Sequence, residues 1–177
     1  MPAADVPSVA PESFTGALAA AANGVCVVTT AAGGRRAGLT VSSMCSVCAE
    51  PPLLLACVNL DNEFDELAAR AGTFAVNILE SRHAALATVF ARLVEPPPRP
   101  DGLAPDRFDA GDWGTLATGA PTLADALVSL DCTLDSTLER GTHRIWIGRV
   151  VALATSPGVP LVYTSRAFAS TRSLDPG

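Results

Sequence analysis

The sequence contains no lysine, so all twelve basic residues are arginines. Schiff-base chemistry, a lysine general base and the phosphate-binding lysine of a P-loop are therefore excluded together. Histidine is nearly as scarce, with only His83 and His143 in 177 residues. A three-histidine zinc site needs one more imidazole than the chain has, so that class of metal site is excluded too.

The sequence also lacks any block of basic residues, and its formal net charge at pH 7 is −6. Such an acidic chain does not attract a phosphate backbone, so we expect no nucleic-acid partner. No apolar run approaches the ~20 residues of a membrane span, and residues 1–10 lack the basic start and apolar stretch of a signal peptide. We therefore expect a cytoplasmic protein without a membrane-spanning segment.

The five cysteines are an odd number in a chain with no export signal, so we expect them to stay reduced. Cys26, Cys57 and Cys132 fall in strand-like apolar patterns. Cys45 and Cys48 form a single CxxC motif, and without a second pair of ligands we expect no metal there.

Apolar residues are abundant, at 49% of the chain with a mean hydropathy of +0.32. Disorder needs low hydrophobicity and high charge, so it is excluded outside the tails. We expect one domain over residues 11–170, with flexible tails at 1–10 and 171–177. The high hydropathy also indicates more apolar surface than one small core hides, which favours a homodimer.

Periodicity divides the chain into seven expected strands and three expected helices. The strands cover 25–30, 37–41, 53–58, 73–79, 128–135, 144–153 and 160–164, and the helices cover 11–22, 62–70 and 81–93.

Local signals add detail to these elements. The Gly33-Gly34 pair predicts a hairpin, and the continuous apolarity of residues 53–58 predicts a strand buried on both faces. Phe14 and Leu18 keep the spacing of a buried helix face. Residues 94–121 are expected to form a long loop, of the kind that often covers a site.

The strands do not alternate regularly with helices, which disfavours a doubly wound parallel sheet. The short turns indicate antiparallel hairpins. We therefore expect a mainly β protein with peripheral helices, in the form of a closed or split barrel.

Three features could carry chemistry, and each has a plainer alternative. The hydroxyls of residues 40–46 follow a strand and could bind a phosphate, or they could only satisfy a turn. Asn77, polar in an apolar strand, could contact a ligand or be satisfied by nearby backbone. His143, in a β-turn after Gly141 and Thr142, could act on a substrate or be merely solvated.

Familiar catalytic motifs are missing, since the chain has no GxSxG, no HExxH and no GxGxxG after a strand. Hydride transfer makes different demands, because a cofactor supplies the chemistry while the protein supplies apolar walls and orientation. The composition is compatible with that role.

A series of short motifs resembles the flavin reductase-like family, whose members include small NAD(P)H:flavin oxidoreductases that supply two-component monooxygenases. Each motif is weak alone, but together they keep the family's order over most of the chain, roughly residues 14–168. The motifs are GVCVVTT (24–30), GLTVSSMCSV (38–47), PPL (51–53), FAVNIL (74–79), LA (86–87) with FA (90–91), GAP (119–121), GTH (141–143), IGRV (147–150) and PLVY (160–163).

The resemblance implies an FMN-binding split β-barrel of the Greek-key type, which forms a homodimer with the flavin at the subunit interface. It also implies a set of cofactor-binding residues. The hydroxylated run would lie along the ribityl chain and phosphate of the flavin, and residues 57–59 would lie beside the isoalloxazine ring. Asn77 would lie near the flavin, and Tyr163 and Phe168 would lie at the edge of the pocket. That set is Thr40, Val41, Ser42, Ser43, Ser46, Cys57, Val58, Asn59, Asn77, Tyr163 and Phe168. It implies a catalytic role for His143, where the nicotinamide stacks on the flavin ring, and no metal.

Two positions depart from the family pattern. Thr142 stands where members often have aspartate, which puts the orientation of His143 in doubt. His83 stands where members often have glutamine; it could donate to the flavin phosphate or be a solvated residue at the helix start.

The resemblance thus implies an NAD(P)H-dependent reductase of FMN or FAD that passes reduced flavin to a separate monooxygenase. The alternative is a flavin-binding protein on the same fold that does not use NAD(P)H.

Overall fold

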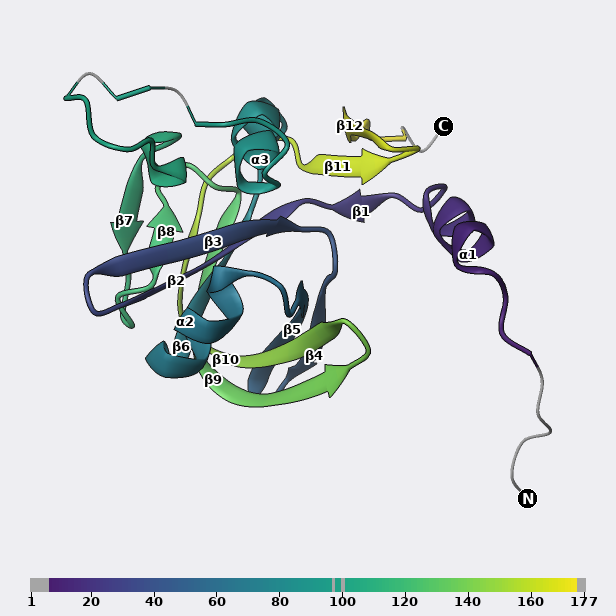
Figure 1. The fold of residues 1–177 in the computed structure, drawn as a ribbon, viewed down its shortest axis with the longest axis horizontal. Coiled ribbons are helices and arrows are strands. Elements are labelled where there is room, and N and C mark those ends of the chain that lie inside the picture. Colours follow the sequence, from purple (N-terminus) through teal and green to yellow (C-terminus); the bar gives the residue numbers. More distant parts are fainter. Residues whose placement is uncertain (1–6, 97, 100, 175–177) are drawn as a thin grey trace.

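The structure, a computed structural model, describes residues 7–96, 98–99 and 101–174. Its helices are α1 (Pro11–Leu18), α2 (Glu63–Ala71) and α3 (Ala84–Phe90), with 3₁₀ turns η1 (Ser81–His83) and η2 (Arg107–Asp109). Its strands are β1 (Asn23–Gly24), β2 (Cys26–Ala32), β3 (Arg35–Val41), β4 (Met44–Ala49), β5 (Pro52–Asn59), β6 (Thr73–Ile78), β7 (Trp113–Thr115), β8 (Pro121–Leu123), β9 (Val128–Arg140), β10 (His143–Thr155), β11 (Leu161–Thr164) and β12 (Ala167–Ser170). The expected mainly β architecture with peripheral helices is confirmed (Figure 1).

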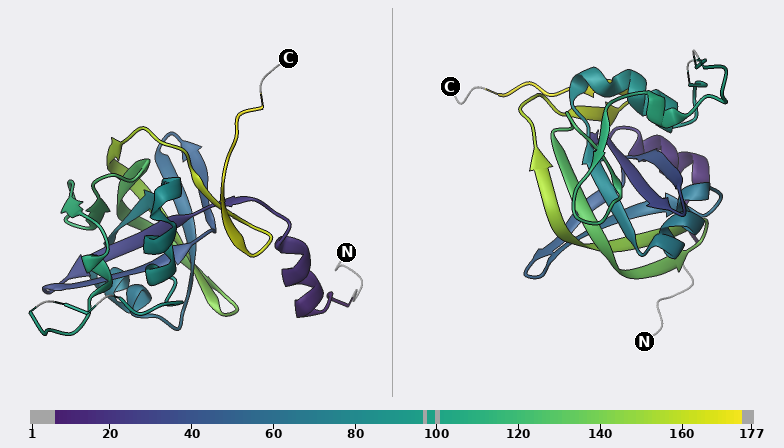
Figure 2. Two further views of the ribbon diagram at one scale, coloured as in Figure 1. Left: turned by 90° about the horizontal axis from the view of Figure 1, so that it is seen from above. Right: turned by 90° about the vertical axis from the view of Figure 1, so that its left-hand side faces the viewer.

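Seven strands form one antiparallel sheet in the order β3-β2-β6-β9-β10-β5-β4. Its two edge strands, β3 and β4, are consecutive in the chain and are joined only by Ser42 and Ser43. The sheet therefore curls until its edges meet at that corner, which we call the seam (Figures 1 and 2). Strands β1, β11 and β12 form a small separate sheet beside the seam.

The short-range signals produce the elements they predict. Gly33 and Gly34 have φ of +57° and +76° and join β2 to β3 in a hairpin. Asn62 caps α2 by accepting the backbone N–H groups of Phe64 and Asp65, and Gly72, at φ +66°, ends the helix.

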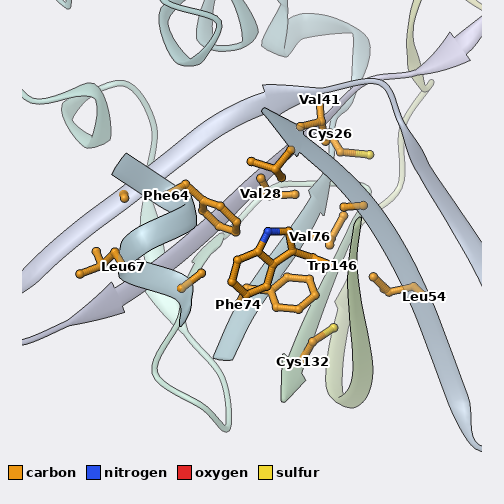
Figure 3. Close-up of a cluster of buried hydrophobic side chains, with 14 residues drawn as sticks. Cys26, Val28, Val41, Leu54, Phe64, Leu67, Phe74, Val76, Cys132 and Trp146 are labelled. Atoms are coloured by element: carbon orange, nitrogen blue, oxygen red, sulfur yellow. The ribbon is translucent and has the colours of Figure 1, made fainter. Parts of the chain in front are cut away.

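An aromatic cluster fills the curled sheet beneath α2. The Trp146 ring lies between Phe64 and Phe74, with centroids 5.8 and 6.1 Å away in edge-to-face geometry (Figure 3). The indole N–H donates to Asp65 Oδ1 at 3.1 Å, and Arg144 pairs with the other oxygen of that carboxylate. The buried polar groups of this core are thus satisfied.

The expected loop over residues 94–121 is only partly irregular. It contains η2 and β7, and Phe108 and Trp113 pack with Phe90 of α3 in a second core cluster. These aromatics are too widely spaced to give a periodic pattern, so the sequence did not reveal their burial. The helix expected over 81–93 is also shorter, and Leu93, expected in its apolar stripe, is exposed.

Helix α1 ends at Leu18 rather than residue 22 and stands apart from the barrel (Figure 2). Phe14 and Leu18 are 54% and 53% exposed, so their predicted burial is wrong for the single chain. The spacing was correct for a helix, but none of the residues that the structure describes buries that face.

Strand β5 is also less buried than expected. Leu54, Ala56 and Val58 face the core, whereas Leu53, Leu55 and Cys57 on the other face are partly exposed. Edge strand β4 was not predicted, and its residues are largely exposed. Both strands therefore present an outer face that the single chain leaves open.

Residues 7–10 and 171–174, within the expected tails, carry no helix or strand, and residues 1–6 and 175–177 lie outside the described residues. No helix in the described part of the chain has the length and apolarity needed to cross a membrane.

Candidate functional site

A hollow of about 180 Å³ opens at the seam, and we call it the seam hollow. It brings together five of the predicted cofactor-binding residues from β3, the β3–β4 corner and the β11–β12 hairpin. The lining residues are Val25, Thr40, Val41, Ser42, Ala91, Leu93, Tyr163 and Phe168. The Tyr163 and Phe168 rings meet edge to face at 5.5 Å and form an aromatic wall.

A second hollow, of about 630 Å³, shares Ser42 and Tyr163 with the first and adds Ser43 and Arg166. Arg166 brings a positive charge that no sequence pattern predicted to be part of a site. It follows β11 in a left-handed turn, with φ of +62°. Together the two hollows join apolar and aromatic walls to a hydroxylated, cationic end.

The hydroxyl groups at the β3–β4 corner differ in whether their hydrogen is already donated within the chain. Thr40 Oγ1 donates to the Ala87 carbonyl at 2.7 Å, and Ser43 Oγ donates to the Cys57 carbonyl at 2.9 Å. A hydroxyl has one hydrogen, so these two keep only acceptor capacity toward a ligand. Ser42, exposed in both hollows, is the seryl donor best placed for an anion.

From the seam, the outer face of the barrel continues across β5 to His143. The Cys57 N–H donates to the Ser43 carbonyl at 3.2 Å, which ties β5 to the corner. Asn59, two residues further on the same face, is paired in register with His143 of β10. Ser43, Cys57, Asn59 and His143 thus form a continuous strip.

Val58 differs from its two neighbours on β5 in the direction of its side chain. Val58 lies between Cys57 and Asn59, so its side chain points to the opposite face, where it is 1% exposed in the aromatic core. Only its backbone is available to a ligand at the outer face.

Thr142 contacts His143 directly. Its Oγ1 lies 2.9 Å from His143 Nδ1, and its carbonyl accepts the Leu60 N–H at 3.0 Å. Both residues are exposed. The hydroxyl therefore occupies the position from which a carboxylate would hold the ring, and it does so without charge.

Asn77 has no free hydrogen-bonding group. Its amide donates to the Val27 carbonyl and Thr29 Oγ1, at 3.1 and 3.2 Å, and its oxygen accepts the Leu123 N–H and Ser129 Oγ–H, at 2.9 and 2.8 Å. The residue is fully buried. This is the structural alternative stated for Asn77, and its side chain has no donor or acceptor left for flavin.

His83 is bonded within the chain at Nδ1, whereas its buried Nε2 is close to a carboxylate but makes no hydrogen bond among the described residues. Its Nδ1 accepts the Glu80 N–H at 3.2 Å, and its Nε2 lies 3.2 Å from Asp125 Oδ2. The ring is buried, so the solvated interpretation is wrong, and His83 lines neither of the two hollows. Its contact with a flavin phosphate stays a prediction.

Ser46 lies away from the seam hollow. It is exposed on β4, where it lines a separate apolar hollow of about 430 Å³ with Cys45, Cys48 and Leu53. Among the described residues no cluster of three or more His, Cys, Asp or Glu could hold a metal ion.

Glu80 offers a pH-dependent test of this region. Hydrogen bonds from Ser81 Oγ, at 2.7 Å, and from the Arg82 N–H, at 3.2 Å, hold the pKa of the Glu80 carboxyl below its usual value. A depressed pKa in the folded state adds stability that is present above the unfolded-state pKa of about 4.3 and is lost as the pH falls further.

We therefore expect Glu80→Gln to destabilise the protein at neutral pH, with a smaller difference from the parent chain at about pH 3.5. Urea unfolding of both proteins at the two pH values measures this. An equal difference at both pH values would assign the effect to packing instead of charge.

The comparisons with known proteins point to one family. Residues 18–172 match the model of the flavin reductase like domain. The "FMN reductase (NADH) RutF" of Bradyrhizobium diazoefficiens is 38% identical over 169 residues, which are 95% of this chain and 89% of the relative.

Two solved structures agree with this match. The NADH:FAD oxidoreductase SgcE6 of Streptomyces globisporus, in complex with NAD and FAD fragments, superposes with a TM-score of 0.80 at 28% identity, covering 97% of this chain and all of SgcE6. BorF, the flavin reductase component of a bacterial two-component tryptophan halogenase, has a TM-score of 0.79 at 30% identity, covering 93% and 100% of the two chains. With most of its length matched in sequence and in fold, this chain belongs to the flavin reductase-like family.

Proposed function

We propose that the protein is an NADH-dependent FMN reductase. The observation that carries the proposal is the seam itself, where a hydroxylated, cationic end, an aromatic wall and the strip to His143 form one continuous surface. The FMN reductase (NADH) among the relatives supports the choice of FMN and NADH. FAD and NADPH are the alternative flavin and donor.

The residues at the seam fit a flavin nucleotide. Ser42 and Arg166 offer hydrogen-bond donors for a phosphate, which the chain must bind without lysine. Tyr163 and Phe168 offer apolar surface, and Cys57 and Asn59 would lie beside the ring system. A bound flavin supplies the hydride-accepting chemistry.

His143 would orient the nicotinamide at the far end of the strip. The contact with Thr142 limits rotation of its ring, and the cross-strand pair with Asn59 holds its backbone. No strong general acid is needed, because water can supply the remaining proton.

Anaerobic addition of NADH to the protein with FMN tests the function. We expect the flavin to bleach, and steady-state NADH oxidation with added FMN to exceed the rate in free solution. Flavin binding without NADH or NADPH consumption would instead establish the alternative, a flavin-binding protein that uses neither donor. Repeating the assay with FAD and NADPH identifies the preferred pair.

Arg166 gives a separate test of the phosphate end. We expect Arg166→Gln to raise the Kd of FMN about fivefold, which corresponds to about 1 kcal/mol for an exposed charged contact. Riboflavin, which has no phosphate, should bind both proteins equally in a fluorescence titration. Equal weakening of both ligands would place Arg166 outside the phosphate site. Glutamine is chosen over glycine because, like arginine, it has a side chain at a residue with φ of +62°, so the substitution removes the charge without making the backbone more flexible.

We also propose that the protein is a homodimer that covers its exposed apolar surface. Val47 of β4 and Val151 and Leu153 of β10 are 48%, 46% and 61% exposed, and the unpacked face of α1 lies beyond the seam. Burying such surface is the usual driving force for association. Light scattering at micromolar concentration should give the dimer mass; a stable monomer would contradict the proposal.

A separate flavin-dependent oxygenase or halogenase is the partner class that such a reductase would serve, as BorF serves a halogenase. We propose a cytoplasmic location, because the proposed activity needs a supply of NADH.

A further inference from the structure

A fourth hollow, of about 620 Å³, lies at the end of β3 opposite the seam and is lined by four arginines. We call it the arginine hollow. Arg35 and Arg36 begin β3, Arg92 follows α3, and Arg107 belongs to η2. A chain with twelve arginines and a net charge of −6 thus gathers a third of its positive charges around one cavity.

The carboxylates around this hollow do not match the arginines one to one. Arg36 pairs with Asp106 at 2.8 Å, and its guanidinium lies 4.5 Å from the Phe108 ring centroid. Glu63 serves two arginines, since it contacts both Arg107 and, at 3.5 Å, Arg92. The third lining carboxylate is that of Glu95.

Arg107 carries the decisive atom. Its side chain is 18% exposed, and its Nη1 is buried with no hydrogen-bond partner among the residues that the structure describes. An unsatisfied buried donor is destabilising, and more so when it is charged. A ligand in the hollow would bring acceptors to the guanidinium groups that line it, and Nη1 could reach one of them if the Arg107 guanidinium turned toward the hollow.

We infer that the arginine hollow binds phosphate, presented either as free inorganic phosphate or as the diphosphate of a nucleotide. Phosphate oxygens match the planar fork of arginine donors, which can bind them in bidentate fashion. The hollow shares no lining residue with the seam hollow, so this site is additional to the proposed flavin site.

Isothermal titration calorimetry with pyrophosphate tests the inference in the absence of flavin and NADH. The protein and pyrophosphate solutions are both in chloride buffer of the same ionic strength. We expect saturable binding to the parent protein. Arg35→Gln combined with Arg92→Gln should raise the Kd at least tenfold, because two of the four guanidinium groups are lost. Arg172→Gln, which removes an exposed arginine outside the hollow, should leave the Kd unchanged and serves as the matched control.

Glu63→Gln should lower the Kd of pyrophosphate, whereas the arginine substitutions raise it. A variant that failed to fold could not bind more tightly, so this result would not be explained by unfolding. The substitution frees Arg92 and Arg107 from their shared carboxylate, which is why we expect tighter pyrophosphate binding. No saturable binding by the parent protein, or an equal loss in the Arg172 control, would overturn the inference.

Two further ligands distinguish the sources. ADP binding more tightly than pyrophosphate would identify a nucleotide diphosphate as the ligand, whereas inorganic phosphate and ADP binding equally would identify the phosphate group alone. Either result supports the site. Because these measurements need no turnover, failure of the reductase assay would leave them intact.

Discussion

Asn77→Ala should lower the free energy of unfolding by about 3 kcal/mol, because it removes four buried hydrogen bonds and leaves the Leu123 N–H without its acceptor. The Val27 carbonyl also loses the donor supplied by the amide. The Ser129 and Thr29 hydroxyls each lose one bond, but each keeps a backbone carbonyl as acceptor. These groups come from β2, β8 and β9, so the amide joins three strands. Urea unfolding measures the change.

Ser129→Ala is the matched control for this prediction. It removes one of the four hydrogen bonds and should cost about 1 kcal/mol. The FMN affinity of folded Asn77→Ala protein, measured at a temperature well below its unfolding midpoint, should be nearly unchanged. A stable variant that had lost FMN affinity would instead make Asn77 a ligand contact.

His143→Ala should reduce NADH-dependent turnover about tenfold, through a higher KM for NADH or slower flavin reduction, with little change in FMN affinity. Tenfold corresponds to about 1.4 kcal/mol, the size of one hydrogen bond or stacking contact in the transition state. We expect turnover and FMN affinity to respond differently because His143 lies at one end of the strip, whereas the donors proposed to bind the FMN phosphate lie at the other end, at the seam. Stopped-flow reduction and an FMN titration measure the two effects.

Thr142 supplies the control for His143. Thr142→Val keeps the shape and removes the hydroxyl that lies 2.9 Å from His143 Nδ1, so it should reduce turnover by less than His143→Ala does. Thr142→Ser keeps the hydroxyl and should restore most of the rate. Unchanged kinetics in His143→Ala would establish the solvated-turn alternative.

Much of the fold could be predicted because its signals are local. Gly33-Gly34, the Asn62 cap and Gly72 specify dihedral angles and hydrogen bonds within a few residues, so the β2–β3 hairpin and α2 formed as expected. Alternation over residues 128–135 likewise predicted β9, although the strand runs on to Arg140.

The candidate site was predictable only in part. The ordered motifs placed Thr40, Ser42, Tyr163 and Phe168 in one set, and the seam hollow brings these residues together. Arg166 had no such signal, because an arginine in a turn is unremarkable until β11 and β12 place it beside the β3–β4 corner.

By itself, the sequence determined the family, the helix caps, the tight turns and most of the strands, since each depends on neighbours along the chain. Only the tertiary structure decided which polar groups remain free. The hydrogen bonds of the Asn77 amide are made by β2, β8 and β9, whereas His83 keeps one ring nitrogen beside Asp125 without a hydrogen bond among the described residues. Val58 was a candidate until strand pairing turned its side chain inward. Partners for a buried amide or imidazole come from segments distant in the chain, so no local pattern can reveal whether its hydrogen bonds are already made.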